Sequence, residues 1–147
     1  MLPEKLQEII EDFEFITDRN ERAEYLIEIA DRFKDVKVPA EISTAPHPEI
    51  NHVTMCESDA YVWAIDQADG TQKYYFDVLN PQGLSAMAMS VILGETLSGQ
   101  SPEAVAQVPS DIVLKIFGRE VSMGKGQGLM GIVNMVGAFA KTKLQKG

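Results

Sequence analysis

Helical periodicity at both ends of the chain, interrupted by one stretch of β-type residues, is the feature that most restricts the fold. Apolar residues recur every three or four positions from Leu6 to Ile16 and again from Ala23 to Phe33, as on amphipathic helices. The same spacing returns from Leu84 to Ile92 and from Leu129 to Ala140. The sequence therefore predicts an α+β fold in which helices pack against a small sheet.

The middle of the chain predicts a small antiparallel sheet of about three strands. Asn51–Val53, Tyr61–Ile65 and Lys73–Val78 carry β-branched and aromatic residues, and Gln67–Gly70 is a turn signal between the last two. Cys56 falls where the first strand ends. We expect a single domain over residues 1–147, because a chain of about 150 residues buries enough surface to fold without disulfides or a structural metal.

Capping residues mark three further helix boundaries. Ser101-Pro102-Glu103 has the order of an N-cap, a first helical position and a favourable first-turn acid. Ser110-Asp111 predicts a short helix that ends at Gly118. The glycine-rich residues 124–128 are expected to be a loop before the last helix.

Charge excludes one class of partner. Thirteen Lys and Arg against 22 Asp and Glu give a net charge of −9, and such a chain repels phosphate backbones, so nucleic acid is not an expected partner. No stretch has the roughly 20 apolar residues of a membrane span or the pattern of a signal peptide. With a free thiol, this predicts a cytoplasmic protein. The first two predicted helices carry many acidic residues. These residues form either a solvated helix face or a docking surface for a basic partner.

Gly126, Gly128 and Gly131 satisfy the G-x-G-x-x-G pattern of dinucleotide-binding proteins. That site also needs a strand before the glycines and an acidic residue about 20 positions after them, inside a strand–helix–strand unit. This chain offers one more helix and then ends. We therefore interpret the glycines as a tight loop with close helix packing.

The histidines and methionines favour structural interpretations. His47 and His52, with Glu49 or Asp59, could form a loose metal site, but their spacing puts no pair on one helical face. We expect surface histidines and no metal or organic cofactor. The methionines in the helical segments are expected to fill the core; these are Met87, Met89, Met130 and Met135.

Cys56 is the only cysteine, which excludes an intramolecular disulfide and any cysteine-clustered metal site. It lies in a polar stretch suited to a loop tip, where thiols are accessible. Glu57 and Asp59 disfavour a thiolate, because like charges repel. A reactive Cys56 therefore needs a nearby cation, for which Lys125 and His52 are the candidates.

Four segments occur in an informative order: Tyr25–Ala30, Val53–Ser58 followed by Val62-Trp63, Ser98–Val105, and Ser122–Leu129. They are similar to the patterns Y-L-I-E-L-G, V-x-G-C-x-S-x-V-W, S-G-x-T-P-E-x-I and S-P-S-R-x-x-G-L of the SufE family. The resemblance spans from about Arg22 to Ala140. It implies the fold that SufE proteins share with IscU-type scaffolds for iron–sulfur clusters.

The chain departs from this pattern at the cysteine. Met55 stands where the family has a glycine, and the segment between Cys56 and Trp63 is two residues longer than in the family pattern. A longer or bulged cysteine loop is therefore expected. Lys125 stands where the family usually has arginine. Asn80–Gly83 occupies a region where many members carry an acidic pair, so no acidic functional residue is assigned there.

The resemblance implies a sulfur acceptor, not an enzyme in its own right. In that family the cysteine takes a persulfide sulfur from a cysteine desulfurase, stimulates the desulfurase and passes the sulfur to an Fe–S scaffold, without a cofactor on the acceptor. Cys56 would be the acceptor and Lys125 a cation that stabilises its thiolate. Met55, Val62 and Trp63 are the apolar residues expected to shelter the persulfide.

Other hypotheses remain open at this point. The chain could be a non-catalytic interaction module of the same fold, which a fully buried Cys56 would favour. A scaffold is disfavoured because clusters need several cysteines, and a thiol peroxidase because the P-x-x-x-T-x-x-C surroundings are missing. The sequence leaves the oligomeric state, the particular desulfurase and the particular scaffold open.

Overall fold

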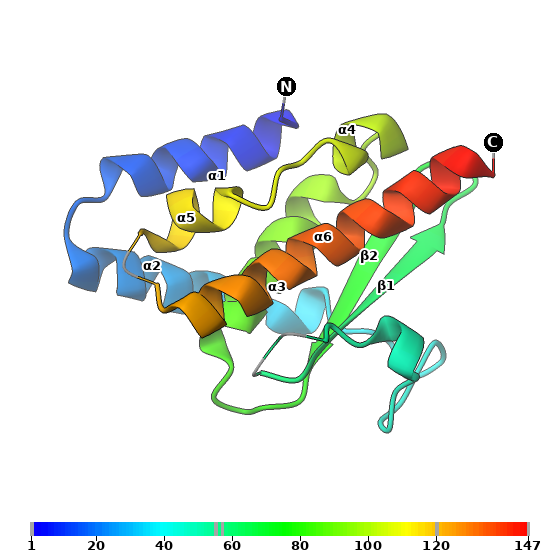
Figure 1. Cartoon of the computed structure of the whole chain (residues 1–147), viewed down its shortest axis with the longest axis horizontal. Coiled ribbons are helices and arrows are strands. Elements are labelled where there is room, and N and C mark those ends of the chain that lie inside the picture. Colours follow the sequence, from blue (N-terminus) through cyan, green and yellow to red (C-terminus); the bar gives the residue numbers. More distant parts are fainter. Residues whose placement is uncertain (1, 55, 57, 120, 147) are drawn as a thin grey trace.

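The computed structural model describes residues 2–54, 56, 58–119 and 121–146. Helices pack against a single antiparallel strand pair (Figure 1), which confirms the predicted α+β class. The elements in chain order are α1 (Glu4–Phe15), α2 (Arg19–Ala30), the 3-10 turns η1 (Phe33–Asp35) and η2 (Glu49–Asn51), β1 (Ala60–Asp66), β2 (Gln72–Val78), α3 (Leu84–Leu97), α4 (Pro102–Ala106), α5 (Ile112–Phe117) and α6 (Met123–Gln145).

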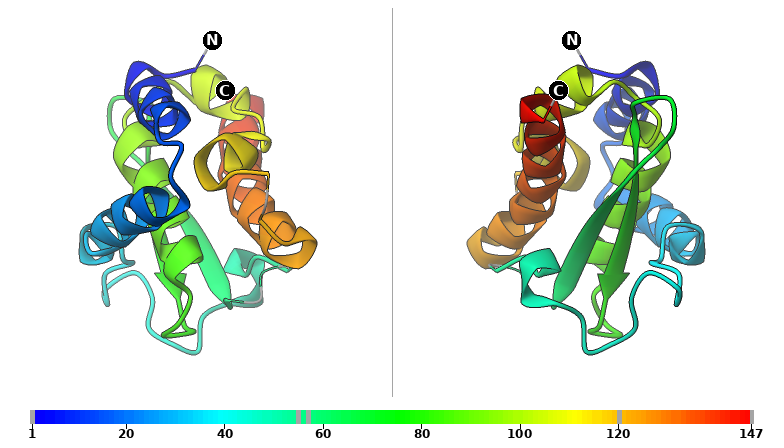
Figure 2. Two further views of the ribbon diagram at one scale, coloured as in Figure 1. Left: turned by 90° about the vertical axis from the view of Figure 1, so that its left-hand side faces the viewer. Right: turned by 90° about the vertical axis from the view of Figure 1, so that its right-hand side faces the viewer.

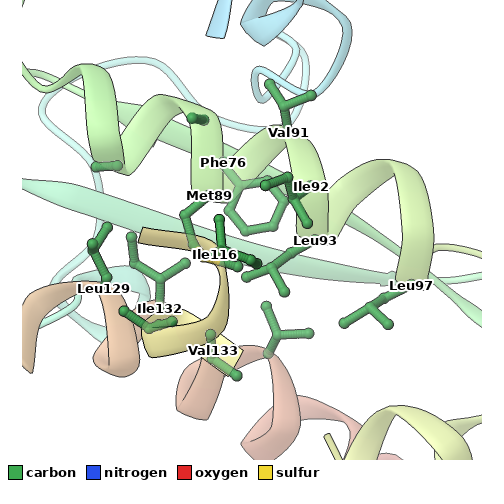
Figure 3. Close-up of a cluster of buried hydrophobic side chains, with 14 of the residues drawn as sticks. Phe76, Met89, Val91, Ile92, Leu93, Leu97, Ile116, Leu129, Ile132 and Val133 are labelled. Atoms are coloured by element: carbon green, nitrogen blue, oxygen red, sulfur yellow. The ribbon is translucent and has the colours of Figure 1, made fainter. Parts of the chain in front are cut away.

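Helix α3 is the centre of the fold, because ten of its fourteen residues are buried. A helix that is apolar on all sides must be covered on all sides. The two edge-on views show α5 and α6 on one side of α3 and α2 on the other (Figure 2). Met89, Ile92 and Leu93 of α3 lie in one cluster with Phe76 of β2 and Ile132 of α6 (Figure 3).

Strands β1 and β2 form an antiparallel hairpin with a register that runs from Ala60 opposite Val78 to Asp66 opposite Gln72. Because alternate residues face opposite sides of a strand, Ala60 and Val62 join the main core. Tyr61 and Trp63 point the other way and form a second small cluster with Val38. The hairpin is therefore covered on both faces.

The predicted third strand is wrong in part. Asn51 closes the 3-10 turn η2, and the segment after it contributes an isolated bridge between His52 and Tyr61. The backbone N–H of His52 donates to the Glu49 carbonyl, so it is used locally. The Asn51 side chain donates to the Val62 carbonyl at 2.9 Å, where a third strand would have placed a backbone group.

The last helix begins earlier than expected, at Met123 rather than Leu129. Ser122 is its N-cap, and the Ser122 Oγ accepts from the backbone N–H of Lys125 at 3.3 Å. The glycine-rich segment is therefore the first turns of α6 and not a loop. Among the described residues, no helix is long and apolar enough to cross a membrane.

Arg22 joins the N-terminal hairpin of helices to α5. Its guanidinium donates to the carbonyls of Ile116 at 2.6 Å and Ile16 at 2.9 Å. A third bond reaches the Phe13 carbonyl at 3.3 Å. One side chain thus bonds to carbonyls at the ends of α1 and α5, and at Phe13 it shares the carbonyl with the backbone N–H of Ile16.

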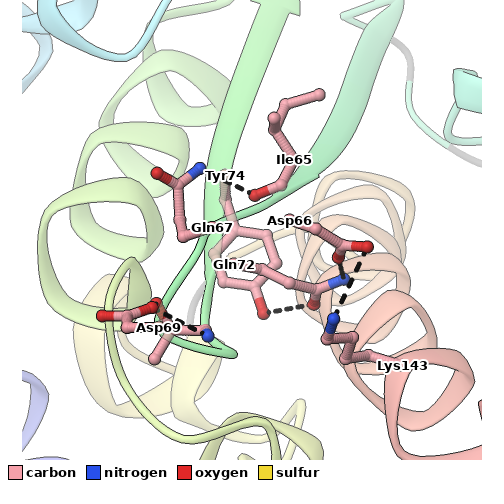
Figure 4. A network of polar contacts seen from close by, with 8 residues as sticks. Ile65, Asp66, Gln67, Asp69, Gln72, Tyr74 and Lys143 are labelled. Atoms are coloured by element: carbon pink, nitrogen blue, oxygen red, sulfur yellow. Dashed lines mark hydrogen bonds and ion pairs between the residues drawn. The ribbon is translucent and has the colours of Figure 1, made fainter. Parts of the chain in front are cut away.

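The far end of the hairpin carries a polar network (Figure 4). The buried Tyr74 hydroxyl donates to the Gln72 side chain at 2.9 Å, and Gln72 in turn donates to Asp66 at 3.2 Å. Lys143 of α6 lies 3.6 Å from the same carboxylate. Burial, with a smaller contribution from the negative charge of Asp66, raises the pKa of Tyr74.

Candidate functional site

Cys56 lies in the connection between η2 and β1, half-buried against the main core. Backbone bonds shape this connection: the Cys56 N–H donates to the Val53 carbonyl at 3.4 Å, and the Asp59 N–H donates to the Cys56 carbonyl at 3.2 Å. The thiol is free. Cys56 is therefore held by its neighbours in the loop without being shut inside the protein.

A small cavity connects Cys56 to Lys125. It has a volume of about 30 Å³, and Cys56, Ser58, Ser85, Ala86, Lys125, Gly128 and Leu129 line it. Such a volume admits about one small atom or water molecule. Cys56 and the candidate cation, 69 positions apart in the printed sequence, therefore share one cavity.

Lys125 lies in the first turn of α6 and is exposed. The N-terminus of a helix carries a partial positive charge, which favours a nearby anion. At this cavity the lysine charge and the helix end have the same sign, so both favour negative charge beside them.

A larger hollow adjoins the Cys56 cavity. It measures about 520 Å³, and Arg19, Ser85, Phe117, Val121, Ser122 and Lys125 line it. Ser85 and Lys125 belong to both spaces. The Cys56 cavity therefore lies beside an open surface depression with two basic side chains.

The second candidate cation, His52, contacts an acid instead of the thiol. Its Nε2 lies 2.8 Å from Asp59 Oδ1, and its Nδ1 lies 3.1 Å from Glu49 Oε1. The two ring nitrogens thus face different carboxylates. Glu57, the other acid expected near Cys56, lies outside the described residues.

His47 is not a surface histidine, which corrects the expectation from sequence. Its side chain is 1% exposed, because its ring nitrogens contact Asp77 Oδ2 and Ser43 Oγ, each at 2.7 Å. The ring also packs edge-on against Tyr61 and Trp63. This arrangement anchors the proline-rich segment to the outer face of the hairpin.

The two histidines therefore serve separate places in the fold. Among the residues that the structure describes, no group of three or more His, Cys, Asp or Glu side chains could hold a metal ion. In particular, the nitrogens of His52 point from opposite edges of one ring, so Glu49 and Asp59 do not converge on a common point.

The shelter predicted for the cysteine is wrong for Val62 and Trp63. Val62 belongs to the main core and Trp63 to the cluster on the outer face of the hairpin. Neither lines the Cys56 cavity, whose apolar walls are Ala86 and Leu129. Met55 lies outside the described residues.

The glycines of the G-x-G-x-x-G pattern lie inside α6. Gly126 and Gly128 are buried, and a Cβ on Gly131 would lie 2.9 Å from Val53 Cγ1. Gly131 thus lets the helix approach the residues before Cys56 closely.

Among the methionines expected to fill the core, Met89 is fully buried, while Met87, Met130 and Met135 pack at the core margin.

Comparisons with known proteins agree with this architecture. Residues 7–140 match the sequence profile of the SufE family, described as an Fe-S metabolism associated domain. The chain is also similar to a solution structure of a hypothetical protein from Thermus thermophilus, with 27% identity, a TM-score of 0.73 and 99% of each chain covered. No curated protein matches the chain.

The chain has an α+β fold with one hairpin, and its lone cysteine is half-buried beside a helix N-terminus. A protein with these features presents a single thiol. The family profile covers 134 of the 147 residues, counting from 7 to 140. The chain belongs to the SufE family, whose members are associated with Fe–S metabolism.

Proposed function

We propose that this protein accepts a sulfane sulfur on Cys56 from a cysteine desulfurase, stimulates that enzyme, and passes the sulfur to an Fe–S scaffold. The observation that carries the proposal is the cavity that Cys56 shares with Lys125. Its volume suits the one additional atom that a persulfide places on a cysteine. Lys125 and the α6 N-terminus favour the anionic sulfur.

The transfer requires one thiolate and no cofactor. The Cys56 thiolate attacks the outer sulfur of the donor's cysteine persulfide, and a new S–S bond forms as the donor's own S–S bond breaks. The donor cysteine leaves as a thiolate and takes up a proton. The oxidation level of the transferred sulfur moves with it, so no external oxidant or reductant is needed.

The cysteine content supports a carrier. A second cysteine nearby would attack the Cys56 persulfide, form a disulfide and release the sulfur, but the chain has only one. A non-catalytic module of the same fold would have no use for an accessible thiol, and Cys56 is half-buried rather than sealed. The proposal assigns the protein to a reducing compartment such as the cytoplasm.

Intact-mass measurement tests the proposal. After incubation with a cysteine desulfurase and cysteine, we expect the protein to gain increments of about 32 Da, one sulfur atom each, that a reductant removes. Cys56→Ser should fold normally, gain no increment and fail to stimulate the desulfurase. A serine variant that stimulates sulfide release as well as the parent would refute the covalent role.

A further inference from the structure

A further cavity, separate from the one at Cys56, contains side chains that the proposed sulfur transfer does not use. It measures about 500 Å³ and lies between the segment that joins η1 to η2 and the last residues of β2, Asp77 and Val78. The Cys56 cavity and the hollow beside it have other walls. A volume of this size is in the range of small-molecule binding sites.

Ser43, His47 and Asp77 form a continuous hydrogen-bonded chain in the wall of this cavity. The Ser43 Oγ lies 2.7 Å from His47 Nδ1, and His47 Nε2 lies 2.7 Å from Asp77 Oδ2. An ionised carboxylate only accepts hydrogen bonds, so Nε2 carries the ring proton and Nδ1 accepts from the Ser43 hydroxyl. A hydroxyl bonded to an imidazole that a carboxylate orients is the arrangement of an activated nucleophile.

The imidazole and the carboxylate are each held in one orientation. The His47 ring packs edge-on against Tyr61 and Trp63, with centroids 5.0 and 4.8 Å away. Asp77 Oδ1 accepts from the Val78 N–H at 2.9 Å. The side chains of His47 and Asp77 are 1% and 9% exposed, whereas Ser43 is half-buried. Ser43 is therefore the member of the chain that a molecule in the cavity reaches first.

The other walls of the cavity indicate the substrate class. Ala40, Ala45 and Val78 line it with small apolar groups, which suit a short aliphatic acyl chain. Lys37 lines the same cavity, and its positive charge favours the negative charge that develops on a carbonyl oxygen during nucleophilic attack. The cavity thus fits a small ester of a short-chain carboxylic acid.

We propose that Ser43 is a nucleophile for such esters, with His47 as its general base. The Ser43 Oγ forms a bond to the ester carbonyl carbon while its proton moves to His47 Nδ1. The bond from that carbon to the alcohol oxygen breaks, and the alcohol leaves with this proton. Water then attacks the acyl-serine, its proton returns through Nδ1 to the Ser43 Oγ, and the carboxylic acid leaves. Asp77 is a positioning residue that keeps the ring proton on Nε2.

Labelling with diisopropyl fluorophosphate tests the nucleophile, after iodoacetamide has blocked Cys56. The protein should gain one covalent adduct, which peptide mass mapping should locate at Ser43. It should also hydrolyse para-nitrophenyl acetate about a hundred- to ten-thousandfold faster than Ser43→Ala, the contribution expected of a general base. Ser43→Ala should gain no adduct.

Ser110→Ala is the matched control, because Ser110 is also half-buried. The ring nitrogens of both histidines bond to other residues, so this variant should label and hydrolyse the ester as the parent does.

Asp77→Asn tests the positioning role. The asparagine amide can donate to Nε2, which puts the ring proton on Nδ1 and leaves the Ser43 hydroxyl without an acceptor. Labelling of Ser43 should then slow by roughly a hundredfold or more. Nitrogen NMR spectra of the imidazole, assigned by comparison with His52→Gln, should show the proton on Nε2 in the parent and on Nδ1 in Asp77→Asn. A purely structural Asp77 would not move this proton.

Three outcomes would overturn the proposal, provided circular dichroism shows the variants folded. These are no adduct on Ser43 in the parent, equal ester hydrolysis by the parent and Ser43→Ala, or a parent His47 that carries its proton on Nδ1. None of these measurements involves a sulfur donor. The result therefore stands or fails separately from the sulfur transfer proposed above.

Discussion

Gly83 and Ser58 approach so closely that a Cβ on Gly83 would lie 2.9 Å from Ser58 Cβ and 2.8 Å from Val78 Cγ1. The glycine is the N-cap of α3, and Ser58 lines the Cys56 cavity. Gly83→Ala should therefore push Ser58 away and reduce the free energy of unfolding by about 1–3 kcal/mol, as overpacking does. Urea unfolding measures the loss, and alkylation of Cys56 reports the displaced loop.

Gly137→Ala is the matched control for that experiment. Gly137 lies inside α6, and nothing lies within 4 Å of a Cβ built there. Alanine in a helix interior is favoured over glycine by about 0.5–1 kcal/mol, so this variant should be slightly more stable than the parent. Equal stability of the two alanine variants would show that Ser58 and Val78 leave room for a Cβ at position 83.

Lys125 should control the reactivity of Cys56 through its charge. Lys125→Glu places a negative charge at the shared cavity, which disfavours a thiolate, so alkylation near neutral pH should slow. Lys125→Arg should retain the parental rate, because the interaction is between charges and needs no particular geometry. Iodoacetamide kinetics across a pH series measure the difference.

Lys141→Glu makes the same charge change in the distant, exposed part of α6 and should leave the alkylation rate unaltered. Equal rates for the parent and Lys125→Glu, with both proteins folded, would remove Lys125 from the site.

The exposed acidic residues on α1 and α2 should accelerate association with a basic partner. Glu8, Glu11, Glu24 and Glu28 are all exposed. Added salt should slow the on-rate of desulfurase binding, since charges beyond about 8 Å are screened at physiological ionic strength. Replacing these four residues by glutamine should flatten the salt dependence in stopped-flow measurements.

Replacing the exposed Glu41 and Glu103, which lie elsewhere, should change the salt dependence less. A salt-independent on-rate in the parent would assign docking to apolar contacts instead.

Tyr74 should make the protein less stable at alkaline pH. Burial raises the pKa of its hydroxyl above the usual value of 10.0, so the folded state holds this proton more tightly than the unfolded state. The stabilisation is therefore complete below about pH 10 and is lost as the pH rises beyond it. Urea unfolding between pH 8 and 11 should show the loss, and Tyr74→Phe should lose less stability over that interval.

Local signals in the sequence predict much of this fold. Ser101 caps α4 as expected, since its hydroxyl accepts from the Ala104 N–H three residues further on. The α+β class follows from the spacing of apolar residues. The predicted start of α6 is wrong because the glycines of residues 124–128 are expected to break a helix, whereas Ser122 caps the helix before them.

The walls of the candidate site could not be predicted in the same way. Ser85 and Ala86 reach the Cys56 cavity only through the packing of α3 against α6, which no local pattern encodes. The sequence places His47 at the surface because its partner Asp77 is 30 positions away. The pairing of Cys56 with Lys125 comes from family resemblance, and both do line one cavity.

The three carbonyl bonds of Arg22 have a mechanical consequence. They attach the α1–α2 hairpin to the last turn of α5, and Phe117, the final residue of α5, lines the hollow that adjoins the Cys56 cavity. The acidic helices therefore meet that hollow in two ways, because Arg22 of α2 bonds to α5 and Arg19 of α2 lines the hollow itself. A partner that binds α2 beside Arg19 therefore sits at the rim of the entrance next to Lys125, some 100 residues further along the chain.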